Sequence, residues 1–139
     1  MATPPTTDRI TDLDARQSKA LRATGKILSP CPATLRPLIA AIPAGRIATL
    51  THLRSVLAEQ HGVSAVCPFT CKVCLKHLAA EEPTLPVWRV LSPDGRLLKY
   101  LPGGASAQAE RLESEGHTLA RSSNVIRLLN YRRLLAPLP

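Results

Sequence analysis

Apolar side chains recur at helical spacing in the middle of the chain, and breaker residues divide them into segments. In residues 33–42 the apolar positions fall three and four apart, as on one face of an α-helix, and Pro43 and Gly45 follow at its end. This pattern predicts a first helix, whose apolar positions are Leu35, Leu38, Ile39 and Ile42.

Two further helices are predicted close together. Thr49 stands before an apolar stripe that runs to residue 57, and a threonine at this position commonly caps a helix by accepting a backbone hydrogen bond. Gly62 follows where the helix is expected to end, because glycine readily adopts the left-handed conformation found there. After a short linker, Pro68 opens a third segment that runs to about residue 82 with apolar residues on one face. Two helices with such a short connection are typical of a helix-turn-helix.

The next region predicts a β-hairpin and a closing helix. Residues 88–104 offer two short strands on either side of Pro93, Asp94 and Gly95, a tripeptide typical of tight turns. Residues 105–116 predict a helix that ends at Gly116. The expected fold class is mainly α with a small β-hairpin, a winged helix-turn-helix, in which the second helix of the pair normally enters the major groove of DNA. The same order of elements also occurs in small domains that bind no nucleic acid.

The two ends of the chain lack this patterning. Residues 1–28 are polar, and we expect a flexible N-terminal arm with a short helix over residues 14–24, so that order begins near Ser29. Residues 29–119 form the predicted domain. Residues 120–139 form a basic C-terminal tail with four arginines and no acidic residue.

Composition narrows the class of partner. At 139 residues, 45% of them hydrophobic, the chain is long enough for one domain with a buried core. A net charge of +8 favours an acidic partner such as the phosphate backbone of nucleic acid. No run approaches the roughly 20 apolar residues that span a bilayer. Three of the four cysteines lie close together, unlike a secreted disulfide framework. We therefore expect a cytoplasmic monomer that does not bind a membrane.

Four motifs between Leu38 and Leu119 follow one another in the order and approximate spacing of a known family. They read IPAGRIATLTHL at residues 42–53, PVWRV at 86–90, DGRLLKYLPGG at 94–104 and RLESEGHTL at 111–119. Over this region the chain resembles the DNA-binding domain of the O6-alkylguanine-DNA alkyltransferases and the alkyltransferase-like proteins. The resemblance implies that the partner is double-stranded DNA and, more specifically, alkylated DNA. It also implies repair proteins as further partners.

The resemblance also implies that the reactive pair of the family is missing. The acceptor cysteine of the family matches Val87, and the histidine that activates it matches Trp88. An isopropyl group cannot accept an alkyl group, and an indole cannot relay a proton at neutral pH. Arg89 stays in register, and Glu115 matches the family's relay glutamate. We interpret this stretch as a pocket wall and a structural latch without catalytic residue, cofactor or metal; the predicted pocket comprises Val87, Trp88, Tyr100, Gly103, Gly104 and Glu115.

The residues expected to face DNA follow from the resemblance and from charge. The family tyrosine that helps to rotate a nucleotide out of the stack matches Leu50, which has no hydroxyl. The arginine that fills the vacated space falls near Phe69 or Lys72; Phe69 is either an apolar wedge between bases or a core residue, and we favour the core. Trp88 is expected to anchor the core beneath the wing, with base stacking as its alternative role. The candidate DNA contacts are Thr49, Leu50, Phe69, Thr70, Lys72, Lys76, Arg89, Arg96 and Lys99.

A cysteine cluster supplies the rival interpretations. Cys67, Cys71, Cys74 and His77 are soft ligands within eleven residues. On one continuous helix the outer pair would lie about 15 Å apart, which is too far for one tetrahedral metal site. Further ligands would have to come from elsewhere, for example from Cys31. Cysteines three residues apart on a helix are commonly small apolar residues that face the core, and we expect that role here.

The function predicted from the sequence is that of a non-catalytic DNA-binding protein that recognises alkylated guanine and flags it for repair. One alternative is an alkyl-accepting methyltransferase in which a relocated thiol, Cys71 or Cys74, takes the alkyl group. The other is a cysteine-based interaction module that binds a metal or senses redox state.

Overall fold

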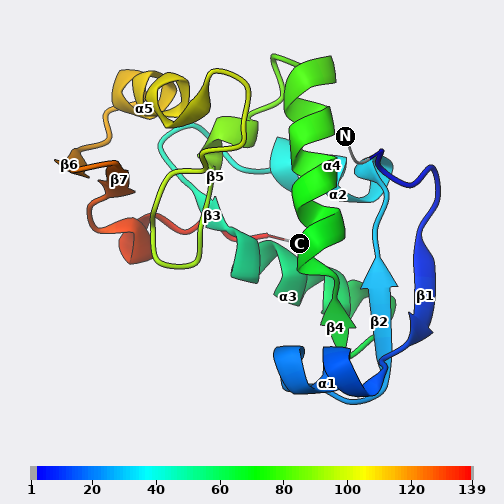
Figure 1. Ribbon diagram of the computed structural model, residues 1–139. Coiled ribbons are helices and arrows are strands. Elements are labelled where there is room, and N and C mark those ends of the chain that lie inside the picture. The colour runs from blue at the N-terminus through cyan, green and yellow to red at the C-terminus, as the bar shows by residue number, and fades with distance from the viewer. Residues whose placement is uncertain (1–2, 139) are drawn as a thin grey trace.

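Helices make up most of the regular structure in the computed structural model, which describes residues 3–138 (Figure 1). The predicted mainly α class with small β elements is confirmed. The first half contains β1 (Arg9–Asp12), α1 (Ala15–Leu21), β2 (Lys26–Ser29), α2 (Pro32–Ala40), β3 (Ala48–Thr49), α3 (Leu50–His61) and β4 (Ala65–Val66). The second half contains α4 (Pro68–Glu81), the 3-10 helix η1 (Val87–Arg89), β5 (Val90–Leu91), α5 (Gly104–Ser114), β6 (Leu119–Ser122), β7 (Val125–Leu128) and the 3-10 helix η2 (Tyr131–Leu134).

The predicted helix-turn-helix is formed by α3 and α4. The Thr49 side chain caps α3 by accepting a hydrogen bond of 3.2 Å from the backbone N–H of His52. Gly62 closes α3 in the left-handed conformation, with φ of 62°. Pro68 then stands in the first turn of α4, where its missing N–H breaks no helical hydrogen bond. Both helices thus begin, and α3 also ends, where these residues predict.

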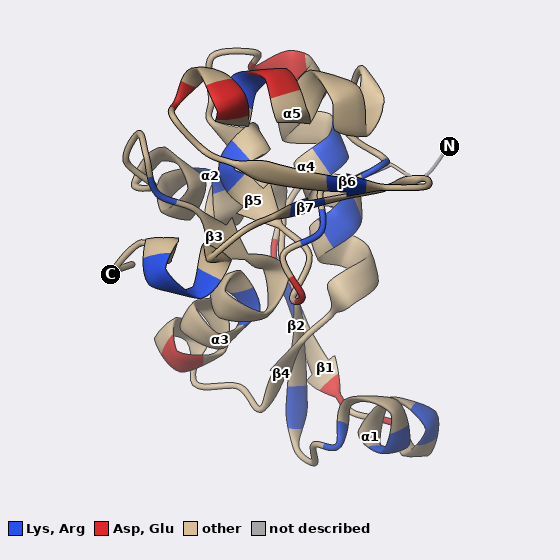
Figure 2. Cartoon of the chain, turned by 90° about the vertical axis from the view of Figure 1, so that its left-hand side faces the viewer, with Lys and Arg blue, Asp and Glu red and all other residues tan. Residues whose placement is uncertain are grey.

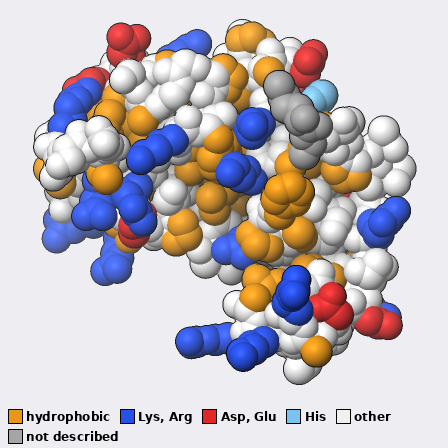
Figure 3. All heavy atoms as spheres, in the orientation of Figure 1, with side chains coloured by type: hydrophobic (Ala, Val, Ile, Leu, Met, Phe, Trp, Pro, Cys, Tyr) orange, Lys and Arg blue, Asp and Glu red, His pale blue; other side chains and the backbone are white. Residues whose placement is uncertain are grey.

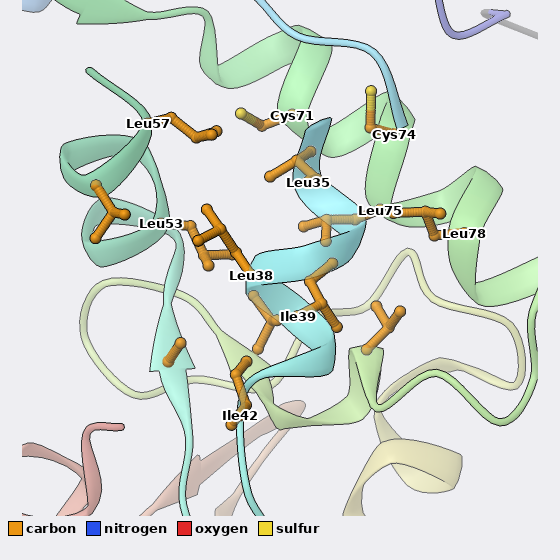
Figure 4. Packing of buried hydrophobic residues seen from close by; sticks show 14 of the residues in the cluster. Leu35, Leu38, Ile39, Ile42, Leu53, Leu57, Cys71, Cys74, Leu75 and Leu78 are labelled. Atoms are coloured by element: carbon orange, nitrogen blue, oxygen red, sulfur yellow. The ribbon is translucent and has the colours of Figure 1, made fainter. Parts of the chain in front are cut away.

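The largest core cluster lies between α2, α3 and α4 (Figure 4). Leu38 and Ile39 of α2, Leu53 and Leu57 of α3, and Leu75 of α4 are each at most 2% exposed. Such apolar positions, three or four residues apart on each helix, place one stripe of every helix in the shared interior. No helix within residues 3–138 combines the length and the apolar character needed to cross a bilayer.

The predicted flexible arm differs from the structure, because its strands pair with each other and with the domain. β1 runs antiparallel to β2, and β2 runs parallel to β4. Ile27 and Leu28 of β2 are buried, at 1% and 0% exposure. The boundary expected near Ser29 is therefore corrected: two buried apolar residues are too short a run to indicate a strand, and β4, its partner, lies far along the chain. The short helix expected within this segment is confirmed as α1.

The predicted wing hairpin is also corrected. The turn forms, since the backbone N–H of Ser92 donates to the carbonyl of Arg96 at 2.9 Å, but β5 pairs in parallel with β3 and not with the segment after the turn. Residues 92–101, here called the wing loop, contact the C-terminal segment instead. The backbone N–H of Leu97 donates to the carbonyl of Ile126 at 2.9 Å. The small β-hairpin of the fold is β6–β7.

The predicted basic tail is part of the folded domain. The boundary expected after residue 119 cuts through β6, and residues beyond the hairpin return to the core. Ile47 accepts a backbone hydrogen bond of 2.8 Å from Ala136 and donates one of 2.9 Å to Leu134. A second core cluster forms there from Ile47, Leu91, Leu97, Ala109, Leu112 and Leu128.

Candidate nucleic-acid interface

A buried ion pair ties η1 to the ends of two helices. The Arg89 Nη2 atom lies 2.6 Å from Glu115 Oε2, and both side chains are largely buried, with 14% and 13% exposure. Arg89 Nη1 also donates to the carbonyl of Ile42, just after α2, at 2.7 Å. The indole N–H of Trp88 donates to Glu115 at 3.2 Å. Arg89, Glu115 and Trp88 are thus joined by hydrogen bonds, and we call this group the latch.

The electrostatics of this latch favour the charged carboxylate. Burial opposes ionisation of Glu115, but hydrogen bonds from Arg89 and Trp88 outweigh it and lower the pKa of the carboxyl group. Burial lowers the pKa of the neighbouring His117, so this imidazole is neutral near pH 7. Glu115 thus remains ionised near neutral pH and bound to Arg89.

A pocket of about 210 Å³ opens between the end of α4, η1 and α5. The Arg111 guanidinium lies 4.4 Å from the centre of the Trp88 ring and covers one of its faces. The Gln108 amide is fully engaged, accepting from Leu98 N–H and donating to the carbonyls of Trp88 and Val90. None of the lining side chains is a nucleophile; they are Ala79, Pro83, Leu85, Val87, Trp88, Leu101, Pro102, Ala107, Gln108 and Arg111.

Four residues that we assigned to the pocket lie elsewhere. Glu115 is held outside it by Arg89. Tyr100 lies beside α4, where the Lys72 ammonium is 4.8 Å from the centre of its ring, and burial raises the pKa of Tyr100 to about 12. Gly103 and Gly104 turn the chain into α5 with positive φ, and a Cβ at Gly103 would lie 2.6 Å from the Cβ of Ala107. The glycines therefore serve backbone geometry and do not line the pocket.

One outer face of α4 carries three of the predicted DNA contacts. Phe69 is 65% exposed, so the core role that we favoured for it is wrong. The buried residues of α4 are Cys71, Val73, Cys74, Leu75 and Leu78; Phe69 lies off the stripe formed by Cys71, Cys74, Leu75 and Leu78 and next to Val73. Lys72 and Lys76 follow Phe69 at intervals of three and four residues, so the three side chains share one exposed face. Thr70, half-buried, lies beside them.

The remaining predicted DNA contacts divide into available and unavailable side chains. Thr49 is 7% exposed and its hydroxyl caps α3, and Leu50 packs partly against the first core cluster. Arg89 is committed to the latch. In contrast, Lys99 is exposed, and Arg96 is half-exposed with its Nε atom 2.6 Å from Asp94. The wing loop therefore presents two basic side chains to a partner.

The cysteines behave as core residues. Cys71 and Cys74 are 3% and 0% exposed, and burial, with smaller contributions from nearby groups, raises the pKa of each thiol to about 12. Thiols with such pKa values stay protonated at neutral pH and are poor nucleophiles. Neither cysteine lines the pocket. Among residues 3–138 no group of three or more His, Cys, Asp or Glu side chains is arranged to hold a metal ion.

Sequence reasoning missed Gln108 and Arg111. They precede Glu115, the residue that follows the end of α5, by seven and four residues, so Gln108 and Arg111 lie on the side of α5 that leads to Glu115. That spacing was available as a signal, because positions i, i+3, i+4 and i+7 share a helical face. Leu101 and Pro102 gave no comparable signal, since the course of the wing loop decides where they lie.

Comparisons with known proteins relate this chain to two solved structures. No protein-family profile and no curated protein matches the sequence. S. pombe Atl1, in complex with damaged DNA containing O6-carboxymethylguanine, superposes with a TM-score of 0.58 at 24% identity, over 76% of this chain and 94% of that one. S. pombe ATL in complex with DNA superposes with a TM-score of 0.57 at the same identity and coverage. The chain therefore shares the fold of these two proteins. The helix-turn-helix class predicted from its sequence is confirmed, with β6–β7 as its small hairpin in place of the predicted wing.

Proposed function

We propose that the protein binds duplex DNA without catalysis, recognises alkylated guanine and marks it for repair proteins, acting as a cytoplasmic monomer. The observation that carries this proposal is a pocket of about 210 Å³ that lacks a nucleophile and adjoins the second helix of a helix-turn-helix. Ala79 of α4 and Trp88 of η1 line the same pocket, so a base drawn out of DNA bound at α4 has a nearby place to lie.

Each exposed side chain of α4 has a defined part in this proposal. Lys72 and Lys76 neutralise phosphates as α4 enters the major groove. Phe69 inserts between bases and fills the space that an extruded nucleotide leaves, which offsets part of the unstacking cost of a few kcal/mol. An alkylated base pairs poorly and is therefore easier to extrude than a normal one.

The pocket walls suit an alkylated base. Val87 and Leu85 offer apolar surface to an alkyl group, and Trp88 offers a ring against which a base can pack. Gln108 has no free amide hydrogen for a new partner. The structural similarity to S. pombe Atl1, solved with DNA that contains O6-carboxymethylguanine, supports recognition of a damaged base.

Intact-mass measurement tests the non-catalytic part of the proposal. After incubation with a duplex that contains O6-methylguanine, we expect the mass of the protein to stay unchanged while the complex forms, because Val87 offers no acceptor atom. A methyl-sized mass gain on Cys71 or Cys74 would contradict the proposal and favour a relocated acceptor. A Cys71→Ser, Cys74→Ser variant would then identify that acceptor, since it would lose the gain.

A further inference from the structure

A second basic surface lies on the side of the molecule formed by β6, β7 and η2. Figure 2 shows basic segments on both strands of the hairpin, and Figure 3 shows Lys and Arg side chains gathered over this side and further basic side chains beside α4 on the same face. Residues 117–139 contain four arginines and no acidic residue. Their charge of +4 is half of the net charge of +8. The excess positive charge is therefore concentrated here.

The hairpin and η2 are held firmly against the wing loop. The backbone N–H of Leu128 donates to the carbonyl of Gly95 at 2.9 Å, on the same edge as the Leu97 to Ile126 bond. The Tyr131 ring packs so closely on Gly95 that a Cβ there would lie 2.5 Å from Cδ1 of Tyr131. The Tyr131 hydroxyl donates to the carbonyl of Pro93 at 3.1 Å. These contacts fix the basic side chains of the C-terminal segment relative to the wing.

The arginines of this surface outnumber their acidic partners. Arg96 and Arg127 share one carboxylate, that of Asp94, at 2.6 and 3.7 Å, and are 52% and 51% exposed. Arg132 and Arg133 are exposed and form no ion pair with any carboxylate of residues 3–138. A groove of about 530 Å³ runs between them, lined by Asp94, Arg127, Asn130, Tyr131, Arg132 and Arg133.

We propose that a basic surface binds the phosphate backbone of duplex DNA beyond the stretch that α4 occupies. This surface, called the hairpin surface, consists of Arg96, Arg127, Arg132 and Arg133. The inference rests on the proposed function and extends it. Guanidinium groups present forked donors that match phosphate oxygens, and here most of those donors have no carboxylate to compete for them. Figure 3 shows Lys and Arg side chains over the side of β6 and β7 and beside α4 in one view, so one duplex can lie across both.

Salt-dependent binding to plain duplexes of about one and about two helical turns, or about 10 and 20 base pairs, tests this inference. The variant is Arg127→Ala, Arg132→Ala, Arg133→Ala. The control, Arg9→Ala, Arg16→Ala, Lys19→Ala, removes equal charge from β1 and α1, which lie at the far end of the molecule (Figure 1). For the longer duplex we expect the variant to lower the magnitude of the salt slope by about two to three units, since each phosphate that is no longer neutralised accounts for about one unit. We expect little change for the shorter duplex and for the control.

The outcomes separate this inference from the proposed function. If the variant keeps the wild-type affinity and slope on both duplexes while Lys72→Ala weakens binding, the hairpin surface does not bind DNA and the proposed function stands. If the wild-type protein binds neither duplex, both are overturned. Equal losses in variant and control would indicate general charge attraction and overturn the inference. Should the alanine variant fail to fold, the single changes Arg132→Ala and Arg133→Ala, each at an exposed side chain, replace it. A slope lowered by about one unit on the longer duplex supports phosphate contact, and an unchanged slope contradicts it.

Discussion

Val87 and Trp88 occupy the positions where the resemblance implies cysteine and histidine, and both have packing roles. Val87 is 1% exposed and forms part of the first core cluster and of the pocket wall. Trp88 packs against the second cluster, with Arg111 over its ring and Glu115 at its indole N–H. The indole therefore anchors the core beneath the wing loop, and it also lines the pocket.

A substitution at Phe69 distinguishes a residue that inserts between DNA bases from a residue that packs in the core. Because its side chain is 65% exposed, we expect Phe69→Ala to change the free energy of unfolding by less than about 0.5 kcal/mol. We also expect the variant to lose any preference for mismatched or alkylated sites, where bases are easier to unstack. Thermal unfolding and competition binding measure the two effects. The matched control is Leu75→Ala, which empties a fully buried site on the same helix and should cost about 2–5 kcal/mol. A stable Phe69→Ala variant with wild-type preference would contradict the wedge.

Glu115 makes the latch sensitive to pH. The pKa of this carboxyl group is lowered in the folded protein, so ionised Glu115 stabilises the fold above the ordinary pKa of about 4.5, and this contribution is lost as the pH falls through the lowered value. We expect Glu115→Gln to cost about 2–4 kcal/mol at pH 7, because it leaves the buried Arg89 without its counter-ion.

Urea unfolding of both proteins at pH 7 and pH 3 measures this prediction. The difference in unfolding free energy between wild type and Glu115→Gln should shrink at the lower pH. Glu113→Gln, which alters the exposed pair with Arg121, serves as the control and should have little effect at either pH. A difference that stays constant between pH 7 and pH 3 would show that the latch does not depend on the charge of Glu115.

At the scale of elements, local signals in the sequence predicted the helices well. Thr49, Gly62 and Pro68 mark helix ends through backbone chemistry that acts within a few residues: α3 lies between Thr49 and Gly62, and α4 begins at Pro68. The wing was misplaced because Gly95 and Leu97 hydrogen-bond to residues of β7 rather than to the neighbouring β5. A turn motif indicates where the chain reverses, but the partner of each strand is decided by packing between distant segments.

Lys72 tests whether α4 is the element that enters the DNA groove. It is exposed on the same face as Phe69 and has no acidic partner within residues 3–138. We expect Lys72→Ala to weaken binding about equally for all sequences and to lower the magnitude of the salt slope by about one unit, as expected when one phosphate is no longer neutralised. Titrations between about 50 and 200 mM salt measure both quantities. Lys19→Ala, at the C-terminal end of α1, is the control. Unchanged affinity in a folded Lys72→Ala protein would place the DNA-facing surface elsewhere.

At the scale of the whole molecule, the candidate site is assembled from segments far apart in sequence. The pocket combines the end of α4 with η1, the wing loop and α5, so its motif residues Val87 and Trp88 could be predicted while its other walls could not. The excess of basic residues could be counted in the sequence, but their arrangement on one surface could not be predicted from it. Only the contacts of Gly95 with β7 and with Tyr131 show that the C-terminal arginines form a fixed surface.

The most direct measurement of the central claim is the affinity of the wild-type protein for two duplexes that differ only in one O6-methylguanine, titrated at the same salt concentration. The pocket and the exposed Phe69 predict tighter binding to the alkylated duplex, while both affinities fall steeply as salt rises. Equal affinity for the two duplexes would contradict recognition of the alkylated base and reduce the protein to a general DNA-binding protein. An affinity independent of salt would contradict binding to the phosphate backbone, and with it the whole account of the surface formed by α4, the wing loop and the hairpin.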